Sequence, residues 1–142
     1  MPMRKGHKAL VAEAMAEIVT LKVEQAIARH ADPDCLLVDL RDVRELEREG
    51  IIPGAFHAPR GMLEFWVDPE SPYFKPIFGE AREFVFFCAG GMRSALATKT
   101  VRDMGMGRVA HIEGGFGAWK KAGGPVAALA PKPDPANKPA KT

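Results

Sequence analysis

The chain has 142 residues, a length typical of one domain that buries enough surface to need no disulfide or metal staple. Hydrophobic residues make up 46% and charged residues 27%, as in ordinary globular proteins, and no uncharged apolar run is long enough to suggest a membrane span. The net charge of +2 is carried by residues 127–142, so the rest of the chain lacks the basic excess typical of proteins that bind nucleic acid.

The chain begins with a basic stretch followed by apolar residues, which is also how an export signal begins. Glu13 and Glu17 interrupt what would be the apolar core of such a signal. The apolar residues between Leu10 and Ile18 instead recur at helical spacing. We therefore expect an amphipathic helix within residues 1–17 that packs on the domain, and we expect a cytoplasmic protein.

Beyond this helix, short apolar runs alternate with helical patterns. We predict strands at 17–20, 35–40, 55–58, 84–87 and 108–112, and helices at 22–30, 42–49, 92–104 and 117–121. The runs at 35–40 and 84–87 are continuously apolar, as expected for strands that are buried on both faces. This alternation predicts an α/β domain over residues 18–126, with a central parallel sheet of about five strands and helices on both faces.

The strand predicted at 84–87 leads directly into Cys88, a Gly-Gly turn and the start of a helix. Ligands of parallel sheets bind beyond the carboxyl ends of the strands. Glycines can take positive φ, so several N–H groups can converge on one anion, and a helix N-terminus adds more of them. The sequence therefore predicts a reactive Cys88 thiolate in a substrate-binding loop formed by Ala89, Gly90, Gly91, Met92, Arg93 and Ser94. Arg93 adds a positive charge at the rim of this loop.

The other potential functional side chains have simpler interpretations. Cys35 lies inside a predicted strand and is expected to be a core cysteine. Two cysteines are too few for a disulfide framework, which fits a reducing compartment. His57 and His111 lie on predicted strands as hydrogen-bonded packing residues. Neither has a metal-ligand partner at suitable spacing, so we predict no metal and no cofactor.

Three segments resemble the signatures of the rhodanese-type single-domain sulfurtransferases. The loop is similar to the active-site pattern of that family and reads Cys88-x-x-Gly91-x-Arg93-Ser94. Residues 38–59 resemble its first signature and residues 114–125 its C-terminal signature, in the expected order. One departure is Ile51, where the family often has His before the Ile-Pro-Gly turn.

The resemblance implies a rhodanese-like fold and a double displacement. The Cys88 thiolate would take the outer sulfur of a donor such as thiosulfate or a persulfide, and the Cys88 persulfide would then pass it to a thiol or cyanide. It also implies that Asp39 and Arg41 form a polar network supporting the pocket floor, with direct substrate contact as the alternative. Glu45 is expected to pair with Arg41 at helical spacing.

Two other functions compete with this one. A non-catalytic or relay module would carry sulfur from one protein to a sulfur-accepting protein, with little turnover on small donors. A cysteine phosphatase or arsenate reductase would also use a thiolate in an amide cradle with arginine. The phosphatase pattern, however, places that arginine six positions after the cysteine, whereas Arg93 is five after Cys88. The tighter loop suits a single sulfur atom better than a phosphate.

Two segments complete the chain. Residues 59–78 form a long connection rich in aromatic side chains. We expect them to wall one side of the Cys88 pocket and select its substrate, or to add helical turns that pack on the sheet, and the two roles do not exclude each other. Residues 127–142 contain four prolines and no aromatic residue, and we predict a flexible tail there.

Overall fold

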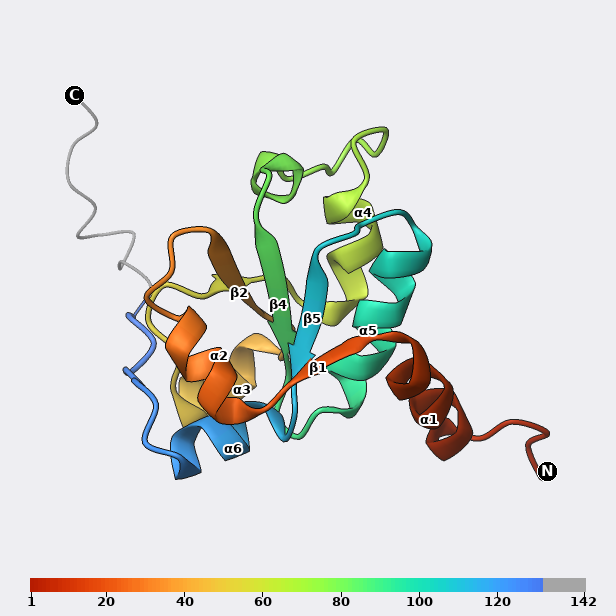
Figure 1. Ribbon diagram of the computed structural model, residues 1–142, viewed down its shortest axis with the longest axis horizontal. Helices are drawn as coiled ribbons and strands as arrows, with labels where there is room; N and C mark the ends of the chain where they lie inside the picture. Colours follow the sequence, from red (N-terminus) through yellow and green to blue (C-terminus); the bar gives the residue numbers. More distant parts are fainter. Residues whose placement is uncertain (132–142) are drawn as a thin grey trace.

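The computed structural model describes residues 1–131 (Figure 1). Its strands are β1 (Val19–Leu21), β2 (Cys35–Asp39), β3 (Phe56–His57), β4 (Glu83–Phe87) and β5 (Val109–Ile112). Its α-helices are α1 (His7–Glu17), α2 (Val23–Arg29), α3 (Val43–Glu49), α4 (Leu63–Val67), α5 (Met92–Asp103) and α6 (Gly115–Lys121). Two short 3₁₀ turns are η1 (Arg60–Met62) and η2 (Pro76–Gly79). Each predicted strand and helix is present, with bounds shifted by at most two residues.

The five strands form one parallel sheet in the order β1-β5-β4-β2-β3. This confirms the predicted α/β architecture. Register pairs Leu37 of β2 with Val85 of β4, and Val85 with Ala110 of β5. The strand β4 therefore lies in the middle of the sheet, and Cys88 follows it directly at the carboxyl edge where parallel sheets bind ligands.

Side chains of β4 alternate between two apolar clusters, one on each face of the sheet. Phe84 and Phe86 pack on one face with residues of α4 and α5, namely Leu63, Val67, Ala97 and Val101. Val85 and Phe87 pack on the other face with residues of α2 and α6, namely Ala26, Phe116 and Trp119. Both faces are thus covered, which explains why the β2 and β4 runs contain so few polar residues.

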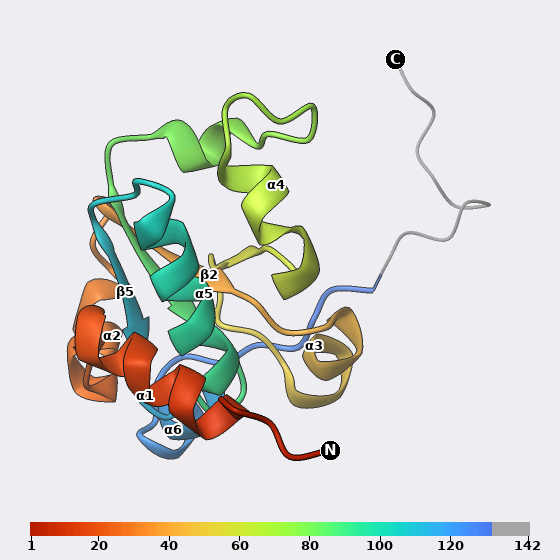
Figure 2. The ribbon, with the colours of Figure 1, turned by 90° about the vertical axis from the view of Figure 1, so that its right-hand side faces the viewer.

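The helix α1 packs against α5, as the two views of the ribbon show (Figures 1 and 2). Ala14 is its one fully buried residue, whereas Leu10 and Met15 are 42% and 39% exposed. Glu17 at its end lies 3.2 Å from Lys99 of α5. Within residues 1–131, no helix is both long and apolar enough to cross a lipid bilayer.

The long connection at 59–78 consists largely of short helical turns. Leu63, Val67 and Phe78 belong to the apolar cluster on the α5 face. The ring of Trp66 meets that of Phe56 edge-on at 6.2 Å, and Phe78 lies 5.6 Å from Phe84 at the start of β4. These contacts favour helical turns that pack on the sheet. Phe78 lies at the edge opposite Cys88, whereas Phe56 is in register with Val38 near the carboxyl end of β2.

The segment predicted as a tail has one ordered contact. Ala127 forms an antiparallel bridge with Ile51, with backbone hydrogen bonds of 2.8 and 2.9 Å. Residues 132–142 lie outside the described part of the chain.

Candidate active site

The loop from Cys88 to Gly91 joins the end of β4 to the first residue of α5. Gly91 caps the helix with φ +111°, a left-handed conformation that residues with a Cβ rarely adopt. In this conformation its backbone N–H points at the cysteine and donates to Sγ at 3.1 Å. The sequence signal of Gly-Gly before a helix is therefore realised as a local anion-binding turn.

The sulfur of Cys88 is covered by its own loop. The residue is 1% exposed, yet it belongs to neither apolar cluster of the sheet. Among the loop N–H groups of the described chain, that of Gly91 donates to Sγ, so the expected convergence of several amides is realised by one. The rim residues Ala89, Gly90 and Met92 are exposed, which leaves the loop itself as the barrier between solvent and sulfur.

The start of α6 holds the first part of this loop in place. Phe116 donates its N–H to the Cys88 carbonyl at 2.8 Å, and Gly117 donates to the Ala89 carbonyl at 3.1 Å. Gly115 has φ +59°, and a Cβ there would collide with the carbonyl oxygens of both Cys88 and Ala89. The Gly114-Gly115 pair in the sequence indicates that the backbone comes close to another group here. The fold shows that this group is the Cys88 loop.

Arg93 makes an ion pair that the sequence analysis did not predict. Its two terminal nitrogens donate to the two carboxylate oxygens of Glu45 at 2.9 and 2.8 Å. Glu45 also accepts the Asp42 N–H at the start of α3. Hydrogen bonds from Arg93 lower the pKa of Glu45 to about 2. The expected pairing of Glu45 with Arg41 is wrong, because Arg41 pairs with Asp39 and Glu45 pairs with Arg93.

Asp39 and Arg41 form a buried ion pair at the carboxyl end of β2. Arg41 donates to both carboxylate oxygens of Asp39, at 3.0 and 2.8 Å, and both residues are at most 2% exposed. The guanidinium also donates to the Gly50 carbonyl at 2.9 Å and lies 4.0 Å from the ring centre of Phe116. This network joins β2, the end of α3 and α6 beside the Cys88 loop.

The second cysteine is in a different environment. Cys35 lies at the start of β2 and is 9% exposed. Burial, with a smaller contribution from the nearby Glu83 carboxylate, raises the pKa of Cys35 to about 12. Its thiol therefore stays protonated at neutral pH, whereas the Cys88 Sγ accepts a hydrogen bond from the Gly91 N–H.

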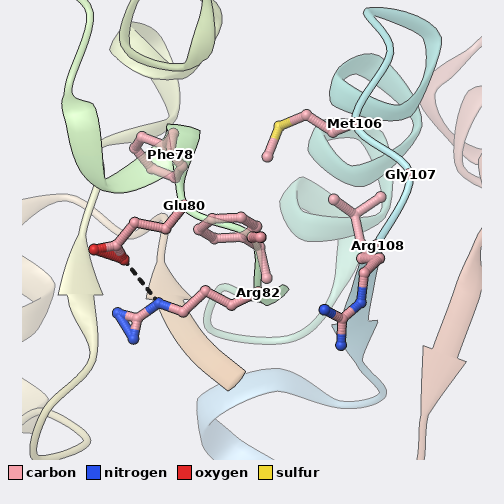
Figure 3. A pocket seen from close by; sticks show the side chains of 9 residues that line it. Phe78, Glu80, Arg82, Met106, Gly107 and Arg108 are labelled. Carbon is pink, nitrogen blue, oxygen red and sulfur yellow. Dashed lines mark hydrogen bonds and ion pairs between the residues drawn. The ribbon is translucent and has the colours of Figure 1, made fainter. Parts of the chain in front are cut away.

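Two pockets help to locate the site. One of about 230 Å³ lies between the amino ends of β4 and β5, far from Cys88 (Figure 3). Arg82 and Arg108 line it, but each is already paired, with Glu80 and Asp34 respectively. A second pocket of about 200 Å³ borders the Cys88 loop and is lined by Val11, Met15, Gly90, Gly91, Met92, His111, Glu113 and Gly114. This second pocket lies beside the Cys88 loop, at the carboxyl edge of the sheet.

The predicted histidines are hydrogen-bonded. The His57 Nε2 lies 2.6 Å from the Arg41 carbonyl, and the His111 Nδ1 lies 2.9 Å from the Ser94 hydroxyl. Across residues 1–131, no three side chains of His, Cys, Asp or Glu are grouped closely enough to hold a metal ion.

Comparison with known proteins identifies the family. The model of the rhodanese-like domain matches residues 22–122. The chain belongs to the rhodanese-like domain family. A sulfurtransferase of Allochromatium vinosum is 34% identical over 95 residues, covering 67% of this chain and 80% of that protein.

Two solved structures extend this comparison of the rhodanese-like chain. A protein of unknown function from Rhodopseudomonas palustris, described as a possible tyrosine phosphatase, has 58% identity and a TM-score of 0.87. The match covers 89% of this chain and 98% of that one. The polysulfide-sulfur transferase of Wolinella succinogenes, a homodimer, has 30% identity and a TM-score of 0.65, covering 87% and 88%. The family contains sulfurtransferases, and a general sulfurtransferase function follows from it.

Proposed function

We propose that this rhodanese-like protein transfers a sulfane sulfur through a persulfide on Cys88. The observation that carries the proposal is the 3.1 Å hydrogen bond from the Gly91 N–H to the Cys88 Sγ, at the carboxyl edge of the sheet. A backbone donor in this position stabilises negative charge on sulfur. The other cysteine has a strongly raised pKa and is a poor nucleophile.

The reaction would proceed in two displacements at sulfur. The Cys88 thiolate attacks the outer sulfur of thiosulfate, the S–S bond of the donor breaks, and sulfite leaves with the electron pair. The thiolate of an acceptor, or cyanide, then attacks the outer sulfur of the Cys88 persulfide, and the Cys88 thiolate leaves. Neither step removes a proton from a hydroxyl, so no general base beside the cysteine is required.

The charge at the rim favours a persulfide or polysulfide donor over thiosulfate. Arg93 lies in the loop, and each of its terminal nitrogens donates one N–H to the Glu45 carboxylate, which balances its charge. A dianionic donor would meet a neutralised pair rather than a free guanidinium. A singly charged persulfide demands less compensation. The polysulfide-sulfur transferase of Wolinella succinogenes, one of the relatives, is compatible with this choice.

The same pair weakens the phosphatase alternative, which the description of the Rhodopseudomonas palustris relative raises. A cysteine phosphatase needs its loop arginine to grip the phosphate with both terminal nitrogens. Here each terminal nitrogen donates one N–H to Glu45, which fixes the guanidinium beside α3, and Arg93 comes one position too early in the loop.

A steady-state assay separates these functions. The purified protein is given a low-molecular-weight persulfide, thiosulfate or p-nitrophenyl phosphate, with cyanide present for the sulfur donors. Formation of thiocyanate that is lost in Cys88→Ser and retained in the matched control Cys35→Ser supports the proposal. Release of nitrophenol by the wild type, with no thiocyanate from either donor, would establish a phosphatase instead.

A further inference from the structure

A chain of side-chain contacts leads from Cys88 through α5 and β5 to β1 and α1. The Ser94 Oγ lies 3.6 Å from the Cys88 Sγ and 2.9 Å from the His111 Nδ1. The His111 Nε2 lies 3.1 Å from the Thr20 Oγ1 and 3.2 Å from the Met15 Sδ. Ser94 and His111 are 0% and 2% exposed, so the chain is closed to bulk water at its centre.

The tautomer of the His111 ring determines which atom can accept a hydrogen bond from the Ser94 hydroxyl. Burial lowers the pKa of His111 to about 4, so the ring is neutral at pH 7 and donates through only one nitrogen. If Nδ1 carries the proton, the ring donates to Ser94, and the hydroxyl proton remains free for sulfur. If Nε2 carries it, the Ser94 hydroxyl donates to Nδ1 and turns its lone pairs toward sulfur.

Only the first arrangement provides a second donor for an anionic sulfur. The Thr20 hydroxyl can complete it by donating to the vacant Nε2 at 3.1 Å, whereas the Met15 Sδ at 3.2 Å can only accept and favours the proton on Nε2. The Gly91 carbonyl, 3.2 Å from the Ser94 Oγ, competes for the same hydroxyl proton. A charged sulfur is the stronger acceptor of the two, because hydrogen bonds to ions are roughly twice as strong as those between neutral groups.

We propose that His111 is a positioning residue for the Cys88 thiolate, and that it acts by donating its Nδ1–H to Ser94. The Ser94 hydroxyl then joins the Gly91 N–H as the second hydrogen-bond donor to the sulfur. The inference rests on the proposed function only in that Cys88 is the reactive residue. It assigns a role in the chemistry to His111, which the sequence analysis expected to be a packing residue of a strand.

Other charged groups surround this chain of side chains and remain constant when His111 is replaced. They are the Arg93–Glu45 pair at the rim, the Asp39–Arg41 pair at the end of β2, Glu113 directly after β5, and the contact of Lys99 on α5 with Glu17 on α1. None of them contacts the His111 ring in the described chain. A change in thiol reactivity on replacing His111 therefore reports the loss of the ring donor.

The test is the pH profile of Cys88 alkylation by iodoacetamide, measured in a Cys35→Ala background. His111→Leu removes the ring donor, so the profile should move upward by about one pH unit and the rate at pH 7 should fall about tenfold. Ser94→Ala should cause the same change. His111→Asn keeps an N–H donor near the place of Nδ1 and should restore most of the rate.

A matched control removes a different buried hydrogen bond of α5. Thr98 is 0% exposed and donates its hydroxyl to the Ser94 carbonyl at 2.7 Å, so Thr98→Val perturbs the same helix without touching the Ser94 hydroxyl. It should lower the melting temperature and leave the profile in place. The double variant Ser94→Ala/His111→Leu should be no slower than Ser94→Ala alone, because both substitutions break one pathway.

Two results would overturn the inference. One is a His111→Leu profile that superimposes on that of the parent, or effects of the two substitutions that add fully. The other needs no variant: ¹⁵N spectra of the reduced wild type that show the His111 proton on Nε2 above the alkylation midpoint. Sulfur uptake from a persulfide is measured on the same samples. Failure of that uptake would count against the proposed function, whereas the alkylation profile alone decides the role of His111.

Discussion

At the scale of single residues, two charged side chains decide what the Cys88 loop presents to a substrate. Arg93 reaches from the loop to Glu45, and Glu45 is held in turn by the Asp42 N–H at the start of α3. The loop arginine thus belongs to a fixed pair of zero net charge. The identity of the donor is expected to depend on this pair as much as on the cysteine.

Substituting Glu45 should therefore change donor preference. In Glu45→Gln the pair gains a net positive charge, so the KM for dianionic thiosulfate should fall about threefold, with a smaller change for a persulfide. Steady-state kinetics with both donors measure the ratio. The control is Glu64→Gln, which removes the carboxylate paired with Arg60 at 2.7 Å on α4 and should leave both KM values unchanged. An equal change for both donors would contradict a charge effect.

At the scale of elements, the first turn of α6 is as important for the loop as the helix that follows the cysteine. Its N–H groups bind the carbonyls of Cys88 and Ala89, and Gly115 permits the close approach. Two helices from separate parts of the chain therefore position a single four-residue loop.

Replacing Gly115 should push the first turn of α6 away from the Cys88 loop. Gly115→Ala introduces a Cβ into a left-handed conformation and against two carbonyl oxygens, which should cost about 2 kcal/mol or more in unfolding free energy. Sulfur transfer should fall as well, because the loop shifts. Denaturant unfolding checks the first effect. In the control Gly117→Ala the new Cβ would lie 3.5 Å from the Ala89 oxygen, an ordinary contact, so the change should stay within about 0.5 kcal/mol. Equal stability of the two variants would refute the packing argument.

The α4 segment should contribute to stability and not to substrate selection. Trp66 is partly buried against the α5-face cluster, so Trp66→Ala should lower the free energy of unfolding by about 2 kcal/mol while KM stays unchanged. Phe65, the neighbouring residue, is 52% exposed, and Phe65→Ala should change little. A raised KM in Trp66→Ala would instead revive the idea that this segment walls the active site.

The elements themselves were predictable because each carries a local signal. Short apolar runs marked the strands, and the Gly-Gly turn after Cys88 marked the start of a helix. The partners across the sheet were not predictable in the same way. The contacts Glu45–Arg93 and Ser94–His111 join residues 48 and 17 positions apart, and no periodicity links them. Helical spacing predicted an ion pair between Glu45 and Arg41. In the fold, Arg41 pairs with Asp39 and Glu45 pairs with Arg93.

At the scale of the whole molecule, the buried neutral His111 makes stability depend on pH. Its pKa is about 4 in the folded protein and about 6.5 in the unfolded chain, so the unfolded chain binds more protons between these values. Stability should therefore be fully present above pH 6.5 and decline toward pH 4, by up to about 3 kcal/mol from this group.

Urea unfolding between pH 4 and pH 7.5 measures this decline. His111→Asn cannot titrate and should show a flatter dependence over the same range, whatever its absolute stability. His7 lies on exposed α1 and provides the control, because His7→Asn should keep the slope of the wild type. Parallel slopes for the wild type and His111→Asn would show that the ring is not buried in its neutral form.

In the proposed reaction, Cys88 is the nucleophile that carries the transferred sulfur. Tandem mass spectrometry of the protein after brief exposure to a low-molecular-weight persulfide, followed by alkylation, locates the transferred atom directly. We predict one added sulfur on the peptide that contains Cys88, removable by cyanide. Added sulfur on Cys35 instead, or none on either cysteine, would contradict the claim.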